Sequence, residues 1–312
     1  MLFRYLYYKF LYILTKDIFY KYLYRNLIKT KNNKIILVYD NKEKIINHSY
    51  RSKGINIYFD GDNNIVKIKM PNKNNLFVEI HSNLSKVILD DEIVGSLGLE
   101  INGISNSIEI HKNNDEKNNK LENVKFFVEG EKNKLNVYPK MENCNINICG
   151  NECSVNIKND VLLKNSNINI SYPPEIVRNS IINIGKFTTF NGVGLQTFED
   201  FSTIEIGEDC QFSWGIDVWC SDSHSIIDED KNIINRGKNI KIGNHVWVGK
   251  DVKINKNTLI PNNCIIGWGS VVTHVFSEPN TIIAGNPAKI VKHNINWDRA
   301  RINKFLEISQ KG

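Results

Sequence analysis

The sequence predicts an all-β solenoid, a fold in which successive turns of the chain stack on one another. Three observations indicate it. Apolar and polar residues alternate in short runs from about residue 31 to 180, a template of Gly and Asn recurs there, and aliphatic residues follow a strict six-residue period after residue 180. We divide the 312 residues into an aromatic and basic helix (1–30), an irregular β-solenoid (31–180), a triangular β-helix (181–292) and a C-terminal helix (293–312).

Residues 1–29 carry most of the net charge, because six Lys and Arg residues against Asp17 contribute +5 of the total +6. Ten Phe or Tyr residues and the absence of Pro and Gly indicate a helix. Charges interrupt it at least every seven residues, which excludes a membrane-spanning helix and a signal peptide. Two interpretations stay open: a peripheral anchor at the inner face of the cytoplasmic membrane, or a helix used for oligomerisation or for capping the core.

The composition excludes several classes of protein. With 41% hydrophobic and 24% charged residues the chain is typical of a soluble globular protein, and charge confined to one end argues against nucleic-acid binding. The cysteines form no CxxC pair, so we expect reduced, buried thiols in a cytoplasmic protein, with no disulfide frame and no metal site. They are Cys144, Cys149, Cys153, Cys210, Cys220 and Cys264.

Four segments of the first solenoid follow one template. They begin at Gly61, Gly103, Gly130 and Gly150, and three residues later stand Asn64, Asn106, Asn133 and Cys153. Apolar residues then occupy offsets five and seven from each Gly. In stacked coils such Asn side chains line up at one corner and satisfy one another along the axis. The irregular spacings of 42, 27 and 20 residues favour a right-handed β-helix with insertions, although an antiparallel sandwich would also give short alternating strands.

The six-residue period after residue 180 predicts a triangular coil, in which six residues form each flat side and about 18 complete a turn. A small or β-branched residue stands four positions after each of the first five aliphatic residues. The aliphatic positions are Ile242, Val248, Ile254, Ile260, Ile266 and Val272, and the positions that follow are Val246, Val252, Thr258, Cys264 and Ser270.

At these residues the chain resembles the hexapeptide-repeat acyltransferases, a family of left-handed parallel β-helices. The resemblance covers about residues 181 to 292 and includes the ending SEPNTIIAGNPAKIVK, which is similar to the family's closing segment. A short helix over 296–310 would then cap the open end of the last coil. Fold alone does not establish an activity, so the site has to decide between an enzyme and a structural rod.

The six-residue register breaks between Val218 and Ile242, so this stretch must leave the prism as a loop. It contains His224, with Asp222 two residues before and Asp228 four residues after. Removing a proton from a hydroxyl needs a base that titrates near neutral pH, which suits an imidazole oriented by a carboxylate. The pattern does not decide between Asp222 and Asp228, and it slightly favours Asp222. A lone surface His in a polar loop is the simpler alternative.

The segments DVWCSDSHSIID and KIGNHVWVG resemble a subgroup of that family, the bacterial polysaccharide and sialic acid O-acetyltransferases. The resemblance implies that His224 is the general base, and that Trp247 lies beside the acetyl group with an oxyanion-stabilising backbone N–H nearby. His245 could as readily be structural. Cys220 is a rival nucleophile by proximity, but no dedicated base for it is evident.

The resemblance also implies acetyl-CoA as the donor, held in a groove between adjacent prisms of a homotrimer. Gly267, Gly269 and Ser270 match the family's glycine-containing coil, and Lys289 and Lys292 match its basic ending. Trp268 departs from the small residue of many relatives, so its indole would either cover the pantetheine arm or narrow the groove.

The expected acceptor is a sugar hydroxyl of a capsule or lipopolysaccharide chain, with sialic acid as one candidate. Two other functions stay open. One is an N-acyltransferase acting on a nucleotide-linked amino sugar, and the other is a non-catalytic β-helical scaffold.

Overall fold

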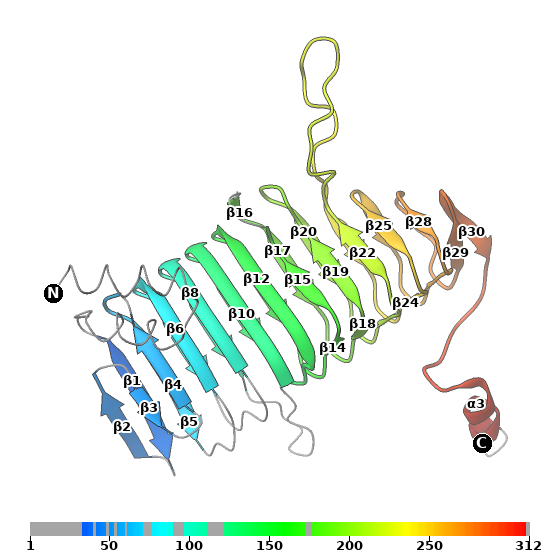
Figure 1. Ribbon diagram of the computed structural model, residues 1–312. Helices are drawn as coiled ribbons and strands as arrows, with labels where there is room; N and C mark the ends of the chain where they lie inside the picture. Colours follow the sequence, from blue (N-terminus) through cyan, green and yellow to red (C-terminus); the bar gives the residue numbers. More distant parts are fainter. Residues whose placement is uncertain are drawn as a thin grey trace, which may run out of the picture.

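The structure, a computed structural model of the chain, describes nine stretches of residues. They are 33–39, 42–47, 50–52, 55–59, 61–70, 76–89, 97–111, 122–171 and 176–309. Within them the chain forms a long solenoid whose strands stack in sequence order from the N-terminal to the C-terminal end (Figure 1). The predicted N-terminal helix lies outside the described residues. None of the described helices is long and apolar enough to cross a membrane.

Three sheets, which we call sheets I, II and III, run along the described solenoid. Sheet I comprises, in spatial order, β2 (Lys42–Ile46), β1 (Lys34–Tyr39), β5 (Ile65–Met70), β7 (Lys86–Leu89), β9 (Ser107–Ile110), β11 (Lys134–Val137), β13 (Ser154–Ile157), β17 (Ile181–Ile184), β20 (Thr203–Ile206), β23 (Ile240–Ile242) and β26 (Thr258–Ile260). Sheet II comprises β3 (Tyr50–Ser52), β4 (Ile55–Phe59), β6 (Leu76–Asn83), β8 (Leu97–Ile104), β10 (Glu122–Glu131), β12 (Asn143–Asn151), β15 (Asn167–Asn169), β19 (Val193–Gln196), β22 (Ile216–Trp219), β25 (Lys253–Asn255) and β28 (Val271–Val272), with β16 (Val177–Arg178) beside β12. Sheet III comprises β14 (Leu162–Lys164), β18 (Thr189–Asn191), β21 (Gln211–Phe212), β24 (Trp247–Val248), β27 (Ile265–Ile266), β29 (Ile282–Gly285) and β30 (Ala288–Lys292).

The number of sides per coil changes along the solenoid. Coils before β13 alternate between sheets I and II, whereas from β14 onward each turn also contributes a strand to sheet III. Sheets I and II continue without a break past residue 181, and their stacked strands pair in parallel, as β13 does with β17. The antiparallel sandwich is therefore excluded. Sheets I and II thus pass through the predicted boundary at residue 181 with the same strand order, and the right-handed winding expected before that residue stays a prediction.

The Asn template is confirmed as a buried ladder at one corner. The Asn133 backbone N–H donates to Oδ1 of Asn106 at 3.0 Å, and the Cys153 N–H donates to Oδ1 of Asn133 at 3.0 Å. The irregular spacing of 42 residues resolves into two coils of 21, because Ser85 stands between Asn64 and Asn106. The Ser85 N–H donates to Asn64 Oδ1, and the Asn106 N–H donates to Ser85 Oγ.

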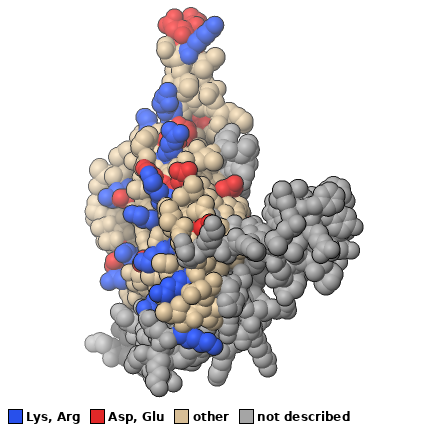
Figure 2. Space-filling model, turned by 90° about the vertical axis from the view of Figure 1, so that its left-hand side faces the viewer, with Lys and Arg blue, Asp and Glu red and all other residues tan. Residues whose placement is uncertain are grey.

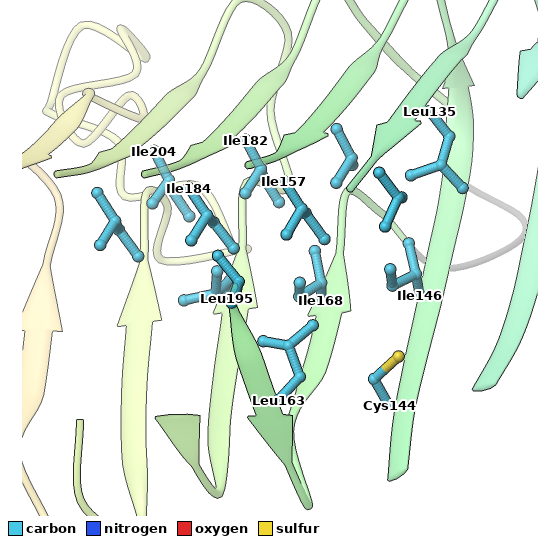
Figure 3. Packing of buried hydrophobic residues seen from close by; sticks show 14 of the residues in the cluster. Leu135, Cys144, Ile146, Ile157, Leu163, Ile168, Ile182, Ile184, Leu195 and Ile204 are labelled. Carbon is cyan, nitrogen blue, oxygen red and sulfur yellow. The ribbon is translucent and has the colours of Figure 1, made fainter. Parts of the chain in front are cut away.

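The interior is aliphatic along the whole described solenoid. The residues at offsets five and seven of the template are buried, as are the aliphatic positions of the six-residue period and the small residues four positions later. Figure 3 shows Leu135, Ile157, Ile182 and Ile204 pointing into the space between the sheets. Each coil buries its aliphatic residues against the next, which gives the stack its cohesion.

Two segments leave the prism at its C-terminal half. Between β22 and β23 the chain projects as a long hairpin, residues 220–239, which we call the arm (Figure 1). After β30 the chain runs back along sheet III before helix α3 (Ile302–Ser309). The predicted helix over 296–310 is therefore shorter than expected, and the residues before α3 cover one side of the prism instead of capping its open end.

Candidate functional site

The base of the arm is held by a carboxylate from the preceding coil. Glu199 lies in the turn between β19 and β20, and its two oxygens receive the Ser221 hydroxyl and, at 2.8 Å, the Gly237 N–H. Ser221 in turn accepts a hydrogen bond from the Ser223 N–H at 2.9 Å. Both limbs of the arm are thus fixed to the Glu199 side chain. His224 directly follows Ser223, the last residue of this hydrogen-bonded group on the first limb.

Asp222 and His224 lie side by side at this base. The His224 backbone N–H donates to the Asp222 carbonyl at 2.8 Å, and the Asn235 amide bridges the His224 carbonyl and the Asp222 carboxylate, both at 2.8 Å. Lys256, just after β25, binds the same carboxylate and donates to the Asn235 carbonyl at 2.6 Å. Hydrogen bonds from Lys256 and Asn235 lower the pKa of Asp222. The His224 imidazole is exposed and has no hydrogen-bond partner among the described residues.

Asp228 occupies a different place. Its carboxylate accepts hydrogen bonds from the backbone and side chain of Asn232 inside the arm, which lower its pKa. It shares the outer part of the arm with the acidic residues Glu229 and Asp230, and Figure 2 shows acidic side chains gathered at the tip. Asp228 is thus committed to the turn of the hairpin, whereas Asp222 belongs to the base that carries His224.

Trp247 lies on another side of the prism, on β24 of sheet III. Its indole is 37% exposed and faces a groove of about 1120 Å³ between sheet III and the C-terminal segment. Trp297, Arg301 and Phe305 line the opposite wall. The Trp247 backbone N–H donates to the Cys264 carbonyl at 2.9 Å, so this N–H cannot stabilise an oxyanion. The Lys250 N–H, three residues further on, has no hydrogen-bond partner in the described part of the chain.

His245 fastens the C-terminal segment to sheet III. Its Nδ1 contacts Asp209 Oδ2 at 2.7 Å, its Nε2 contacts the Trp297 carbonyl at 3.0 Å, and its ring stacks on the Trp297 indole at 4.3 Å. Arg299 binds the other oxygen of Asp209 at 2.8 Å and reaches Thr189 on β18. Both His245 nitrogens are occupied, so this residue is a structural link, as the sequence allowed.

The residues matched to the acetyl-CoA groove lie at the corner between sheets III and II and on β30. Gly269 has φ +69° and open space around it, while a Cβ at Gly267 would lie 2.7 Å from that of Ala284. Ser270 is fully buried, and its hydroxyl donates to the Gly267 carbonyl at 2.7 Å, so its side chain stabilises the corner.

Three of the residues matched to the groove have exposed side chains. They are Trp268, which is 71% exposed, Lys289 and Lys292. The indole of Trp268 contacts the Lys250 ammonium at 5.3 Å and Asp251 Oδ2 at 3.3 Å.

The cysteines bear out the expectation of reduced, buried thiols. Cys220 is fully buried, and burial raises its pKa to about 12. A thiol that is neutral and covered cannot attack a thioester, so Cys220 is excluded as a nucleophile.

The structure brings His224 and Asp222 together, but it does not bring them to Trp247 within one copy. His224 follows a strand of sheet II and projects with the arm, whereas Trp247 is on sheet III. Sequence reasoning missed Glu199, Asn235 and Lys256, which hold the arm, and also Asp209 and Arg299, which hold the C-terminal segment. Only proximity in the fold reveals these residues, because their partners are up to 112 residues away in the sequence.

This combination, a hexapeptide prism with an arm carrying one imidazole and an exposed Trp on the next side, defines a class of enzymes, the hexapeptide-repeat acetyltransferases. No protein-family model matches the chain. A polysialic acid O-acetyltransferase of Neisseria meningitidis is 37% identical over 160 residues, which are 48% of this chain and 74% of that protein. The chain therefore belongs to the polysialic acid O-acetyltransferase family.

Two further relatives agree with this assignment. A polysialic acid O-acetyltransferase of Escherichia coli O1:K1 is 34% identical over 124 residues, although the match spans only 39% of that protein and 39% of this chain. The crystal structure of the polySia-specific acetyltransferase NeuO superposes with a TM-score of 0.53 and 26% identity, covering 70% of this chain and 99% of that one.

Proposed function

We propose that this protein transfers an acetyl group from acetyl-CoA to a sugar hydroxyl of a sialic-acid-containing capsule polysaccharide. The observation that carries the proposal is the arm, which presents an otherwise unpartnered imidazole at a position fixed by Glu199, Asn235 and Lys256. The family membership supplies the class of reaction, and the names of the relatives supply the acceptor.

The catalytic centre is shared between neighbouring copies of a homotrimer. In one copy the arm projects away from the prism, whereas Trp247 faces an open groove on sheet III. His224 and Trp247 of the same copy are therefore not in contact. The charges support a match between copies. The arm tip carries Asp228, Glu229 and Asp230, and the groove is lined by Arg301 and Lys304. The arm of one copy would then carry His224 towards Trp247 of the next.

The donor lies along the corner that bears the exposed Trp268 and Gly269, beside half-buried Gly267. An extended amide chain can pair with main-chain groups there as a strand does. Lys289 and Lys292 on β30 are exposed cations for the nucleotide phosphates. The Ser270 side chain, N–H and carbonyl are all used inside the coil, so we assign Ser270 the role of shaping this corner and no direct contact with the donor.

Transfer is direct. Nε2 of His224 removes the proton of the sugar hydroxyl as its oxygen attacks the thioester carbon. When the tetrahedral intermediate collapses, the C–S bond breaks and the CoA sulfur takes this proton from His224, so CoA leaves as the thiol and the imidazole is neutral again. We assign oxyanion stabilisation to the Lys250 N–H, which has no hydrogen-bond partner among the described residues, since the N–H of Trp247 itself is engaged in the sheet. Asp222 orients the arm through Lys256 and Asn235. General-base catalysis contributes roughly 10² to 10⁴-fold, and one oxyanion donor about 10² to 10³-fold.

The test is the His224→Ala variant, assayed with acetyl-CoA and polysialic acid. We expect turnover to fall by about two to four orders of magnitude with little change in the affinity for CoA. His81→Ala is the matched control, since His81 lies on β6, six strand positions from β22 along sheet II and therefore far from the arm. The assay measures CoA release and the acetyl content of the polymer, with hydroxylamine to distinguish esters from amides.

Three results would contradict the proposal. They are near-full turnover of His224→Ala, a hydroxylamine-stable product, and a protein that neither binds CoA in calorimetry nor forms trimers in light scattering. The second result would favour acylation of an amine, and the third a non-catalytic scaffold.

A further inference from the structure

The outer face of sheet I differs from that of sheet II in charge and in pattern. From β5 to β23 the described outward side chains include five lysines and two glutamates, a balance of +3: Lys67, Lys86, Lys134, Lys158, Lys241, Glu109 and Glu205. From β8 to β25 the described outward side chains of sheet II include Lys125 and Lys253 against Glu100, Glu129 and Asp217, a balance of −1. The cationic face is thus confined to one sheet.

A row of amides runs along the middle of this face. The strand registers place Asn136, Asn156 and Asn183 opposite one another. Asn136 Nδ2 donates to Asn156 Oδ1, and Asn156 Nδ2 donates to Asn183 Oδ1, both at 2.8 Å. An amide has two N–H donors and two acceptor lone pairs, so Asn156, the central member, keeps one of each for a ligand. The row repeats every coil, about 4.8 Å apart.

Cationic and aromatic side chains flank the amide row. On one side, Lys134 is exposed and makes no ion pair within the described part of the chain. On the other side, His111 stacks on Tyr138 with ring centroids 4.5 Å apart, and the Lys158 ammonium lies 5.7 Å from the Tyr138 ring. Lys158 likewise makes no ion pair with a described residue. The two uncompensated charges face the same short stretch of the row.

The row leads towards the arm. Glu205 and Lys241 continue it onto β20 and β23, where they form an ion pair at 3.3 Å. The arm rejoins the prism immediately before β23, and Asn239 accepts a hydrogen bond from the Thr203 N–H at 2.9 Å. A ligand lying along the row would therefore end beside the base of the arm, the element that carries His224.

We infer that the outer face of sheet I, from Lys86 to Lys241, is a docking track for a linear, anionic polysaccharide. Carboxylates would meet Lys134 and Lys158, hydroxyl and amide groups would meet the Asn row, and an apolar sugar face would lie against the His111–Tyr138 stack. The track spans six coil steps, about 29 Å. The choice of acceptor rests on the proposed function, but the track itself concerns binding and not transfer.

The test uses the full-length Lys134→Glu/Lys158→Glu variant in affinity electrophoresis through gels that contain polysialic acid, without acetyl-CoA. We expect polysialic acid to retard the wild-type protein, and the double charge reversal to weaken this binding roughly tenfold, with wild-type retardation falling as salt rises. Lys125→Glu is the matched control, because it reverses an exposed lysine on sheet II of the same solenoid. In kinetics, the double variant should lose efficiency with long chains but keep that with a sialic acid trimer, too short to span the track.

Retention of full binding by the double variant, or equal weakening by Lys125→Glu, would overturn the inference. So would equal loss of activity on the trimer and on long chains. Failure of the proposed function gives a different result, since a protein that transfers no acetyl group would still lose binding to the gel on charge reversal at Lys134 and Lys158.

Discussion

At the scale of single residues, the structure separates side chains that the sequence places in one motif. His245 and Trp247 are two positions apart in HVWVG, yet His245 is engaged on both nitrogens and Trp247 faces the groove. The difference follows from the strand, because His245 precedes β24 at a corner with φ +54° and Trp247 points outward from it. The sequence could name these residues as candidates, but their neighbours Asp209 and Trp297 are needed to tell them apart.

Asp209 links the C-terminal segment to the prism, and its charge makes this link depend on pH. Burial alone would raise the pKa of Asp209, but hydrogen bonds from Arg299 and His245 outweigh it and lower the pKa. A carboxyl with a lowered pKa in the folded state stabilises fully above its ordinary pKa of about 3.9, and this contribution is lost as the pH falls through the lowered value. The segment should therefore stay docked at pH 5 and above and detach only in stronger acid.

The Asp209→Asn variant removes this charge, so we expect residues 293–309 to exchange amide hydrogens faster at neutral pH than in the wild-type protein. Hydrogen exchange of that segment, followed by mass spectrometry from pH 7 to pH 3, measures the effect. Glu208→Gln is the control, because Glu208 is the neighbouring residue and its carboxylate pairs with exposed Lys186 and with no other described residue. Equal protection of the segment in Asp209→Asn and wild type would refute the role given to this link.

At the scale of elements, the corner ladder decides where each coil begins. Asn133 is fully buried, and besides accepting from the Cys153 N–H its amide donates to the Glu129 and Gly150 carbonyls. Removing the amide leaves these groups unsatisfied in a dry corner, where each costs about 1 to 3 kcal/mol.

Asn133→Ala should therefore lower the free energy of unfolding by about 3 kcal/mol, seen as an earlier midpoint in urea. Asn145→Ala is the comparison, since Asn145 is exposed on the adjacent strand β12. If both variants unfolded at the same urea concentration, the ladder would not be a source of stability.

The elements also show which parts of the fold the sequence could predict. The six-residue period predicted β23 to β28 well, because each aliphatic residue there stacks on the equivalent aliphatic residue of the next coil, as Ile242 does on Ile260. The template before residue 181 predicted the ladder but missed the coil of Ser85, since a hydroxyl can replace the Asn oxygen as an acceptor. Glu199 lies in a turn between β19 and β20, and Lys256 lies between the repeat positions Ile254 and Ile260, where the period does not fix the residue type. Periodicity therefore could not predict these two anchors of the arm.

At the scale of the whole molecule, sheets I and II continue without a break through residue 181, where the sequence predicts a boundary between two solenoids. Sheets I and II cross from β13 to β17 and from β15 to β19 with the same parallel pairing as elsewhere. In a linear stack, stability is a sum of coil terms and of terms between neighbouring coils. The coils before and after residue 181 are paired in the same way as any other neighbouring coils. The two halves of the solenoid should therefore be coupled and unfold together.

We therefore expect one calorimetric transition for the wild-type protein, and two for Ile182→Asp, which places a charge in the core between the halves. Ile182 on β17 is fully buried, and a carboxylate there would lose its hydration without gaining a partner. Ile181→Asp is the control, because Ile181 precedes it on the same strand but points outward, so it should leave the single transition in place. Two transitions in the wild-type protein would instead mean that the halves are separate domains meeting at residue 181, as the change of sequence period first suggested.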